Sequence, residues 1–180
     1  DAQAVLDVTA AIGDGTLIGQ GSPMYSTSAR VNLFGPVTLV SHATDVEEVN
    51  DSIATATPTG IFGLDSAPFL GQGGIGDNEN FPLRRGFDVD LFRVDLTARV
   101  TLRIDVDAFE IGSDLDAFVR IFDQNGNPVL DPFTGLPITS DDDAGPVEFR
   151  NRLDPYLEFV PQQSGTFYIG VSGFNNVAYD

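Results

Sequence analysis

The side chains best suited to chemistry in this chain are carboxylates that occur in closely spaced pairs. Aspartates separated by a single residue are found at Asp88 and Asp90, at Asp105 and Asp107, and at Asp114 and Asp116. Carboxylate oxygens are preferred ligands of hard cations such as calcium. Paired carboxylates can also catalyse glycoside hydrolysis, but no nucleophile lies among them and the chain has no Trp that would form a sugar platform. The pairs therefore indicate cation binding rather than catalysis.

An acidic segment at residues 45–52 offers further oxygen ligands. Glu48, Asn50 and Asp51 would present carboxylate and amide oxygens from a single turn. The alternative is a solvated linker in which Asp51 or Ser52 caps a following turn. The residues of this segment alone favour the linker.

Two loop positions complete the set of candidate ligands. Asp77 follows a glycine just upstream of the Asp88 pair, where it either adds an oxygen ligand or stands in a plain turn. Asp142 is the middle one of three successive aspartates, which repel one another unless a cation is present. Acidic surface loops are common, however, so both interpretations of each position stay open.

The charge balance limits the possible partners and reactions. The chain of 180 residues has 27 acidic and nine basic residues, all of them Arg, and a net charge of −18. A nucleic-acid partner is excluded because phosphate neutralisation needs clustered positive charge. Zero cysteines exclude disulfides and cysteine catalysis, and the single histidine, His42, has no partner for a zinc site. No apolar run approaches the roughly 20 residues of a membrane-spanning helix, and no hydrolase motif is present, so we expect no enzyme.

Alternating apolar and polar residues predict the strands that position these acids. The alternation runs through residues 92–96, 100–106, 118–122, 156–160 and 166–172. Asn125 and Gly126 form a strong hairpin signal after the third of these segments. Residues 56–86 are rich in Gly and Pro and predict a long loop with one short strand near residues 59–62. The pattern predicts an all-β fold, a β-sandwich without a long helix.

The first 45 residues are read as an N-terminal arm that precedes the sandwich of residues 46–180. Residues 2–12 are apolar and fit either a short helix or a strand, and residues 29–40 contain extended segments broken at a Gly-Pro pair. No basic, apolar leader precedes Asp1, so we expect that an export signal, if there was one, was removed.

Several motifs in a fixed order resemble one known family. They are the linker from Glu48 to Ser52, the glycine-rich IGDN, then DVDLFRVDL, GSDLDAFVRIFDQNG, the DDD loop, LDPYLEF and SGTFYIGVSGFNN. Together, over residues 46–180, they resemble the bacterial pre-peptidase C-terminal domain. The resemblance implies a jelly-roll-like antiparallel β-sandwich, secreted and not itself an enzyme, beside secreted peptidases or in large surface proteins.

The resemblance also implies a set of calcium ligands. The similar collagen-binding modules bind calcium with an acidic linker and with aspartates near the start of a core strand. Carried over, Glu48, Asn50 and Asp51 match the linker ligands and Asp90 matches a strand-start ligand. Asp88 is a weaker match, because the two strand aspartates of those modules are three residues apart and here the spacing is two. A further linker acid falls on Val46, which cannot bind calcium; a neighbouring acid, Asp45 or Glu47, would have to substitute.

One departure from the family concerns its last strand. Members continue past the strand that matches residues 166–172 into a final strand, and this chain stops at Asp180. We therefore expect a sandwich that is one strand short, with the gap filled by residues 31–34 or 37–40 of the arm. An open sheet edge promotes aggregation, so we expect the arm to fill the gap, either in its own subunit or in the next one. The alternative is that the chain is a fragment of a longer protein. Donation to the next subunit would build a filament.

The sequence thus predicts an extracellular, calcium-stabilised, non-catalytic module with a structural, assembly or adhesive role. Its expected partners are further copies of itself or neighbouring domains of a larger surface protein. The alternative is a subunit of an extracellular filament joined by strand donation, and a carboxylate-based hydrolase is the weakest of the three hypotheses.

Overall fold

The segments with alternating apolar residues form the core strands. The structure is a computed structural model, and it describes residues 2–11, 44–46, 48–63, 68–76, 87–140 and 154–176. β5 (Val89–Leu96) buries Phe92 and Val94 while Arg93 between them is exposed. β6 (Thr101–Asp107) buries Leu102 and Ile104 completely. These strands face each other from two different sheets, and their alternating apolar residues form the core between them.

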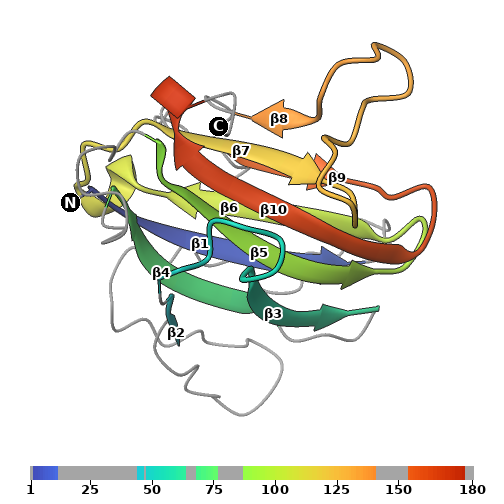
Figure 1. Ribbon diagram of the computed structural model, residues 1–180, viewed down its shortest axis with the longest axis horizontal. Helices are drawn as coiled ribbons and strands as arrows, with labels where there is room; N and C mark the ends of the chain where they lie inside the picture. Colours follow the sequence, from blue (N-terminus) through green and yellow to red (C-terminus); the bar gives the residue numbers. More distant parts are fainter. Residues whose placement is uncertain are drawn as a thin grey trace, which may run out of the picture.

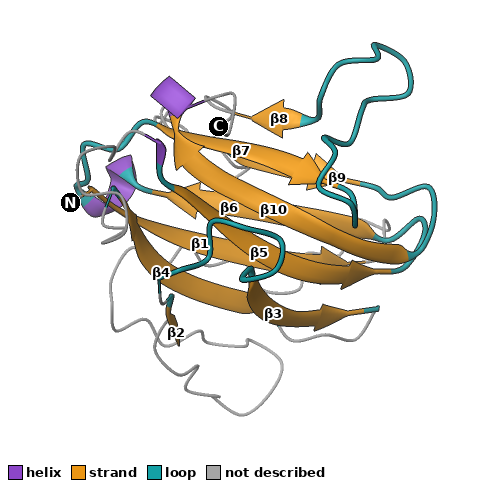
Figure 2. Cartoon of the chain, viewed as in Figure 1, coloured by secondary structure: helices purple, strands orange, loops and turns teal. Residues whose placement is uncertain are grey.

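The two sheets contain five strands each (Figures 1 and 2). The first has the order β2-β4-β1-β6-β9 and the second the order β3-β5-β10-β7-β8. The bounds of the other strands are Ala2–Ala11 (β1), Thr44–Asp45 (β2), Thr57–Phe62 (β3), Phe69–Ile75 (β4), Ala117–Phe122 (β7), Thr139–Ser140 (β8), Tyr156–Phe159 (β9) and Gly165–Gly173 (β10). Two 3-10 turns, Phe109–Ile111 (η2) and Phe174–Asn176 (η3), follow β6 and β10.

The predicted all-β class is confirmed. All but two of the strand pairings are antiparallel, the exceptions being β2 with β4 and β3 with β5. The alternating segments correspond to β5, β6, β7, β9 and β10, and the predicted short strand near residues 59–62 is β3. The hairpin signal is confirmed as well, because a tight turn at Asp123 and Gly126 follows β7 and the chain then folds back at a bridge between Phe122 and Pro128. Among the described residues, no helix has the length and hydropathy of a membrane-spanning segment.

The long loop expected at residues 56–86 was wrong over its middle part. There the structure places β4, whose sequence FLGQGGI contains three glycines. Their neighbours lie close: a Cβ at Gly71 would lie 2.7 Å from the Phe69 ring, so the ring would have to move, whereas one at Gly73 would make an ordinary van der Waals contact with Val46 at 3.4 Å. Glycine is a poor strand former by local propensity, so the strand arises from its pairing with β1 and from the close approach of its neighbours.

The strand from the predicted arm lies inside the sandwich. β1 pairs antiparallel with β4 on one side and with β6 on the other, through seven residue pairs with each. Its register sets Leu6 opposite Val106 and Val8 opposite Ile104, two fully buried core residues. Residues 2–11 are therefore a strand rather than a helix, and they extend the sandwich of residues 46–180. The segments at 31–34 and 37–40 lie outside the described residues.

The strand that matches the last family motif, β10, has both its edges paired. β10 lies between β5 and β7 of the same chain, with eight and six residue pairs respectively. In the first sheet, β1 is the strand that covers the edges of β4 and β6. Donation of a strand to a neighbouring subunit stays a prediction.

Candidate metal centre

The acidic linker crosses from one sheet to the other at the end of the sandwich where β5 begins. At its start, the Val46 backbone N–H donates a 2.8 Å hydrogen bond to the Gln72 carbonyl of β4. Further along, the Leu91 N–H of β5 donates to the Asn50 carbonyl at 3.1 Å. These backbone bonds attach the linker to β4 before Glu48 and to β5 after it.

A turn fixes the other end of the linker. The Thr55 N–H donates to the Ser52 carbonyl at 3.0 Å, and the hydroxyl groups of these two residues lie 2.8 Å apart. Behind this turn Ile53 and Ala56 pack against the outer face of the second sheet, over a small apolar cluster formed by Val89, Leu91, Phe122 and Tyr168. The turn predicted after Asp51 is therefore present, and it positions Asp51 beside the start of β5.

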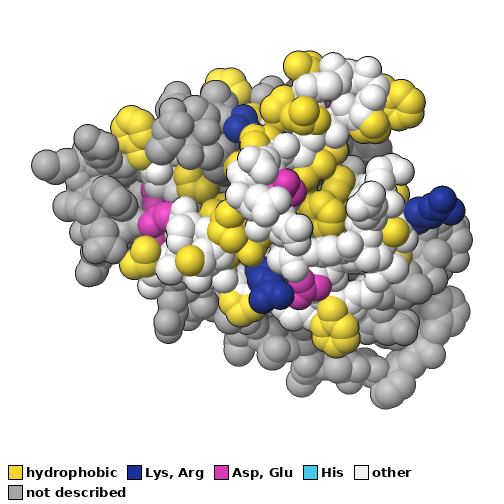
Figure 3. Space-filling view, turned by 45° about the vertical axis from the view of Figure 1, so that its right-hand side comes forward, with side chains coloured by type: hydrophobic (Ala, Val, Ile, Leu, Met, Phe, Trp, Pro, Cys, Tyr) yellow, Lys and Arg dark blue, Asp and Glu magenta, His cyan; other side chains and the backbone are white. Residues whose placement is uncertain are grey.

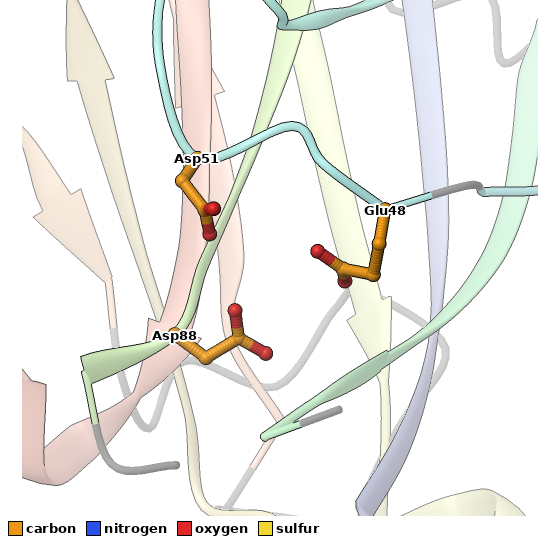
Figure 4. A group of neighbouring side chains, drawn as sticks. All are labelled: Glu48, Asp51 and Asp88. Atoms are coloured by element: carbon orange, nitrogen blue, oxygen red, sulfur yellow. The ribbon is translucent and has the colours of Figure 1, made fainter. Parts of the chain in front are cut away.

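Three carboxylates meet at this crossing. Glu48, Asp51 and Asp88 each place one oxygen so that the three oxygens lie within 4.8 Å of one another. Figure 4 shows the three carboxyl groups pointing toward one another, two from the linker and one from the residue before β5. Glu48 and Asp51 are half-buried, and Asp88 is buried. The Gly76 backbone N–H donates a hydrogen bond to one Asp88 oxygen, which fixes the orientation of that carboxylate.

A buried amide belongs to the same linker. Asn50 is 1% exposed, and its side-chain N–H donates a long hydrogen bond of 3.5 Å to the Thr57 hydroxyl. Its Oδ1 is buried and accepts no hydrogen bond from the described part of the chain. A buried amide oxygen without a donor costs about 1–3 kcal/mol, and a cation ligand position would satisfy it.

Asp90 occupies a different environment from Asp88. It is 5% exposed and lies on the face of β5 that carries the core residues, beside a cavity of about 10 Å³ that Val46, Gly73 and Phe92 help to line. It is not a member of the group of three carboxylates. Asp88 precedes the strand, and it is this first aspartate of the pair that brings an oxygen within 4.8 Å of both linker acids.

The remaining sequence-predicted ligands do not enter this group. Asp77 and Asp142 lie outside the described residues. Val46, which stands where the family resemblance calls for a linker acid, packs against the hydrophobic core. Of the linker acids that would replace it, the side chain of Asp45 and the whole of Glu47 also lie outside the described residues.

The ligand atoms available at this site determine which class of cation it would bind. Carboxylate and amide oxygens suit hard cations, whereas zinc sites are usually built with His or Cys. Calcium binds oxygens at 2.3–2.6 Å, so two of its ligand oxygens are at most about 5 Å apart. Oxygens within 4.8 Å of one another fit that limit. The arrangement can therefore hold a divalent cation and, in holding it, tie the linker to β5.

Comparison with known proteins agrees with the resemblance seen in the sequence. The model of the bacterial pre-peptidase C-terminal domain family matches residues 88–173, which is just under half of the chain. The matched segment begins at Asp88 and ends with β10, so it contains six of the ten strands and one member of the carboxylate group. Domains of this family are non-catalytic, β-rich modules of secreted bacterial proteins. No curated protein and no solved structure matches the chain.

Proposed function

Because residues 88–173 match the pre-peptidase C-terminal domain, we propose that the chain is a non-catalytic, extracellular β-sandwich module stabilised by calcium. Its role is structural, in assembly or adhesion. The observation that carries the calcium proposal is the meeting of Glu48, Asp51 and Asp88, which come from two separate segments of the chain, at one point.

The residues present fit a calcium ion in number as well as in type. Three carboxylates provide three to six oxygens, depending on whether each binds through one oxygen or two. The Asn50 side chain supplies one more, and waters complete the six to eight that calcium takes. When bound, the ion offsets the mutual repulsion of the three carboxylates. The linker then stays attached at the end of the sandwich, since Glu48 and Asp51 lie on the linker and Asp88 directly precedes β5.

Thermal unfolding with calcium and with a chelator tests this proposal. A ligand that binds only the folded state stabilises it by about 2.7 kcal/mol at a concentration 100 times its Kd. For a chain of this size that corresponds to a Tm increase of roughly 5–11 °C. Magnesium serves as the control cation, because it demands a tighter octahedral shell and loses its waters reluctantly. An unchanged Tm at saturating calcium would count against the site.

An extracellular filament built by strand donation is the second candidate, and one observation bears on it. β1 supplies the partner for two strands at once, β4 and β6, so a neighbour's copy of Ala2–Ala11 would fill the same position with the same register. The segment to be exchanged would then be β1 rather than residues 31–40. Each exchange would join two subunits in one direction, and a head-to-tail series of them does not close.

Electron microscopy and size exclusion of the whole chain and of a protein lacking residues 1–45 test the filament. Filaments of the whole chain that the shortened protein does not form, although circular dichroism shows that it is still folded, would support strand donation. If both proteins behave as equal monomers, the filament hypothesis is wrong and the calcium proposal is unaffected.

A further inference from the structure

The large apolar side chains that remain exposed are not scattered over the sheets. Among the described residues they lie at the two ends of the strands. At the end where β5 begins, here called the hinge end, they are Val49, Phe87, Phe109, Ile111 and Phe174. At the opposite end, here called the loop end, they are Phe62, Leu130, Phe133, Leu136 and Val160.

The strand directions place these two groups far apart. β10 runs antiparallel to β5, so η3 after β10 lies beside the start of β5. β6 returns from the end of β5, so η2 also lies at the hinge end. β7 starts at the hinge end and leads into the protruding loop at the upper right of Figure 1. Strands of six to nine residues at about 3.3 Å per residue separate the two ends by roughly 20–30 Å.

The loop between β7 and β8 is held firmly at its base. The Val129 N–H donates to the Ile121 carbonyl at 2.9 Å, and the Ile138 N–H donates to the Val129 carbonyl at 2.9 Å. The side chains of Val129 and Ile138 pack against the hydrophobic core. The loop is therefore an extension of the sheet and not a loose connection.

The tip of this loop is closed around one aspartate. Asp131 Oδ1 accepts hydrogen bonds from the backbone N–H groups of Phe133 at 2.9 Å and Thr134 at 2.7 Å. Its own N–H donates to the Leu136 carbonyl at 2.8 Å, and its carbonyl accepts from the Gly135 N–H at the same distance. Gly135 has a φ of +70°, which suits glycine.

This closed tip presents apolar surface to solvent. Phe133 is 95% exposed, Leu136 65% and Leu130 54%. Figure 3 shows yellow, hydrophobic side chains over the protruding loop. A rigid tip that exposes three large apolar groups has already lost the conformational entropy that binding would otherwise cost.

Charge narrows the choice of partner for the tip. Asp131 is the only charged residue between Gln124 and Thr139, in a chain whose net charge is −18. The hinge end of a second copy carries Glu48, Asp51 and Asp88 beside its apolar side chains, so a tip with a single charged residue can approach that end with little repulsion. It also lacks the basic residues that would attract anionic lipid.

We propose that the tip of the β7–β8 loop binds the apolar hinge end of a second copy of this chain. The apolar group at the hinge end includes Phe109 and Phe174, which are 53% and 45% exposed. The tip and the hinge end are different surfaces, so the contact is head-to-tail and successive contacts extend a chain of molecules. This inference deepens the assembly role in the proposed function, but it does not require calcium.

Complementation between two variants tests the inference. The tip variant carries Phe133→Ser and Leu136→Ser, and the hinge-end variant carries Phe109→Ser. Sedimentation velocity of the whole chain should show association at protein concentrations up to about 1 mM. Added salt should strengthen it, because screening weakens the repulsion between acidic copies. Each variant alone should associate at least about tenfold more weakly.

The mixture of the two variants gives the decisive result. The hinge end of the tip variant and the tip of the other variant are both intact, so the mixture should form dimers and nothing larger. Association of the hinge-end variant at wild-type strength would overturn the inference, because it would show that the tips bind each other. A wild-type protein that stays monomeric at all salt concentrations would overturn it too.

Two controls separate this contact from other causes. Phe62→Ser removes a 70% exposed phenylalanine from β3, at the opposite edge of the same sheet from β8, and should leave association unchanged. Circular dichroism and Tm measurements check that each variant folds. If the Phe109→Ser protein does not fold, Ile111→Ser is used in its place. All samples are measured with calcium and with chelator, so that the calcium proposal and the association proposal are tested separately. Association of a protein whose Tm does not depend on calcium would overturn only the calcium proposal.

Discussion

Replacing Asp88 by Asn should change the stability of the protein in opposite directions with and without calcium. Asp88 is buried and lies within 4.8 Å of two other carboxylates. Asn has nearly the same shape and can still accept the hydrogen bond from Gly76. The substitution therefore removes one negative charge and little else.

The magnitude follows from the distances. Two unit charges 4.8 Å apart repel by about 3.5 kcal/mol at an effective dielectric constant of about 20. Asp88 takes part in two of the three repulsive pairs, but Glu48 and Asp51 are half-buried, so water screens part of this energy. We expect the chelated Asp88→Asn protein to be more stable than the chelated wild type by roughly 1–3 kcal/mol, or about 2–12 °C in Tm.

In saturating calcium the order should reverse. At 1,000 times its Kd the wild type gains about 4.1 kcal/mol, which exceeds the advantage of the chelated variant, whereas the variant has lost one carboxylate ligand and should gain little. Differential scanning calorimetry of both proteins in calcium and in chelator measures all four Tm values. Asp114→Asn is the matched control, because Asp114 is an exposed acid outside the group and its replacement should leave the calcium response intact. An Asp88→Asn protein that keeps the full calcium response would refute the reasoning.

Three further predictions concern the fold. The hydrogen bond from Arg103, at 2.9 Å, lowers the pKa of Glu158 in the folded protein. The pair therefore stabilises the protein at pH values above about 4.3, the pKa of Glu in the unfolded chain. This stabilisation is lost as the pH falls through the lower pKa of Glu158 in the folded state. Since the Glu158 side chain is 49% exposed, Glu158→Gln should lower Tm by only about 1–3 °C at neutral pH and by nothing in strong acid. Gly126→Ala should lower Tm more than Gly135→Ala: both glycines have positive φ, but only at Gly126 would the new Cβ meet a side chain, 2.5 Å away. Removal of residues 1–45 should leave β4 and β6 with unpaired edges and cause aggregation or loss of cooperative unfolding, as followed by circular dichroism and light scattering.

Each of these predictions has a result that contradicts it. A Tm difference between wild type and Glu158→Gln that persists in strong acid would show that the ion pair is not its cause. Equal losses for the two glycine variants would mean that the side chain beside Gly126 moves away at little cost. A shortened protein that unfolds cooperatively at the wild-type Tm would show that β1 is dispensable to the sandwich.

Local patterns were sufficient to predict the strands that are amphipathic. Phe92 and Val94 alternate with polar residues, and the structure buries these two side chains and exposes the residue between them, because side-chain direction in a strand has a period of two. The turn at Asn125 and Gly126 was predictable for a similar reason, since the backbone geometry of a tight hairpin requires these residue types locally.

The sequence by itself therefore determined the fold class, the core strands and the kind of ligand atoms available. Only the tertiary structure decided that the glycine-rich β4 is a strand, that β1 lies between β4 and β6, and that Asp88 rather than Asp90 meets Glu48 and Asp51. Alternation and turn chemistry depend on neighbours along the chain and can be read from it. The meeting of linker and strand depends on pairings between distant segments, whose register no local pattern contains.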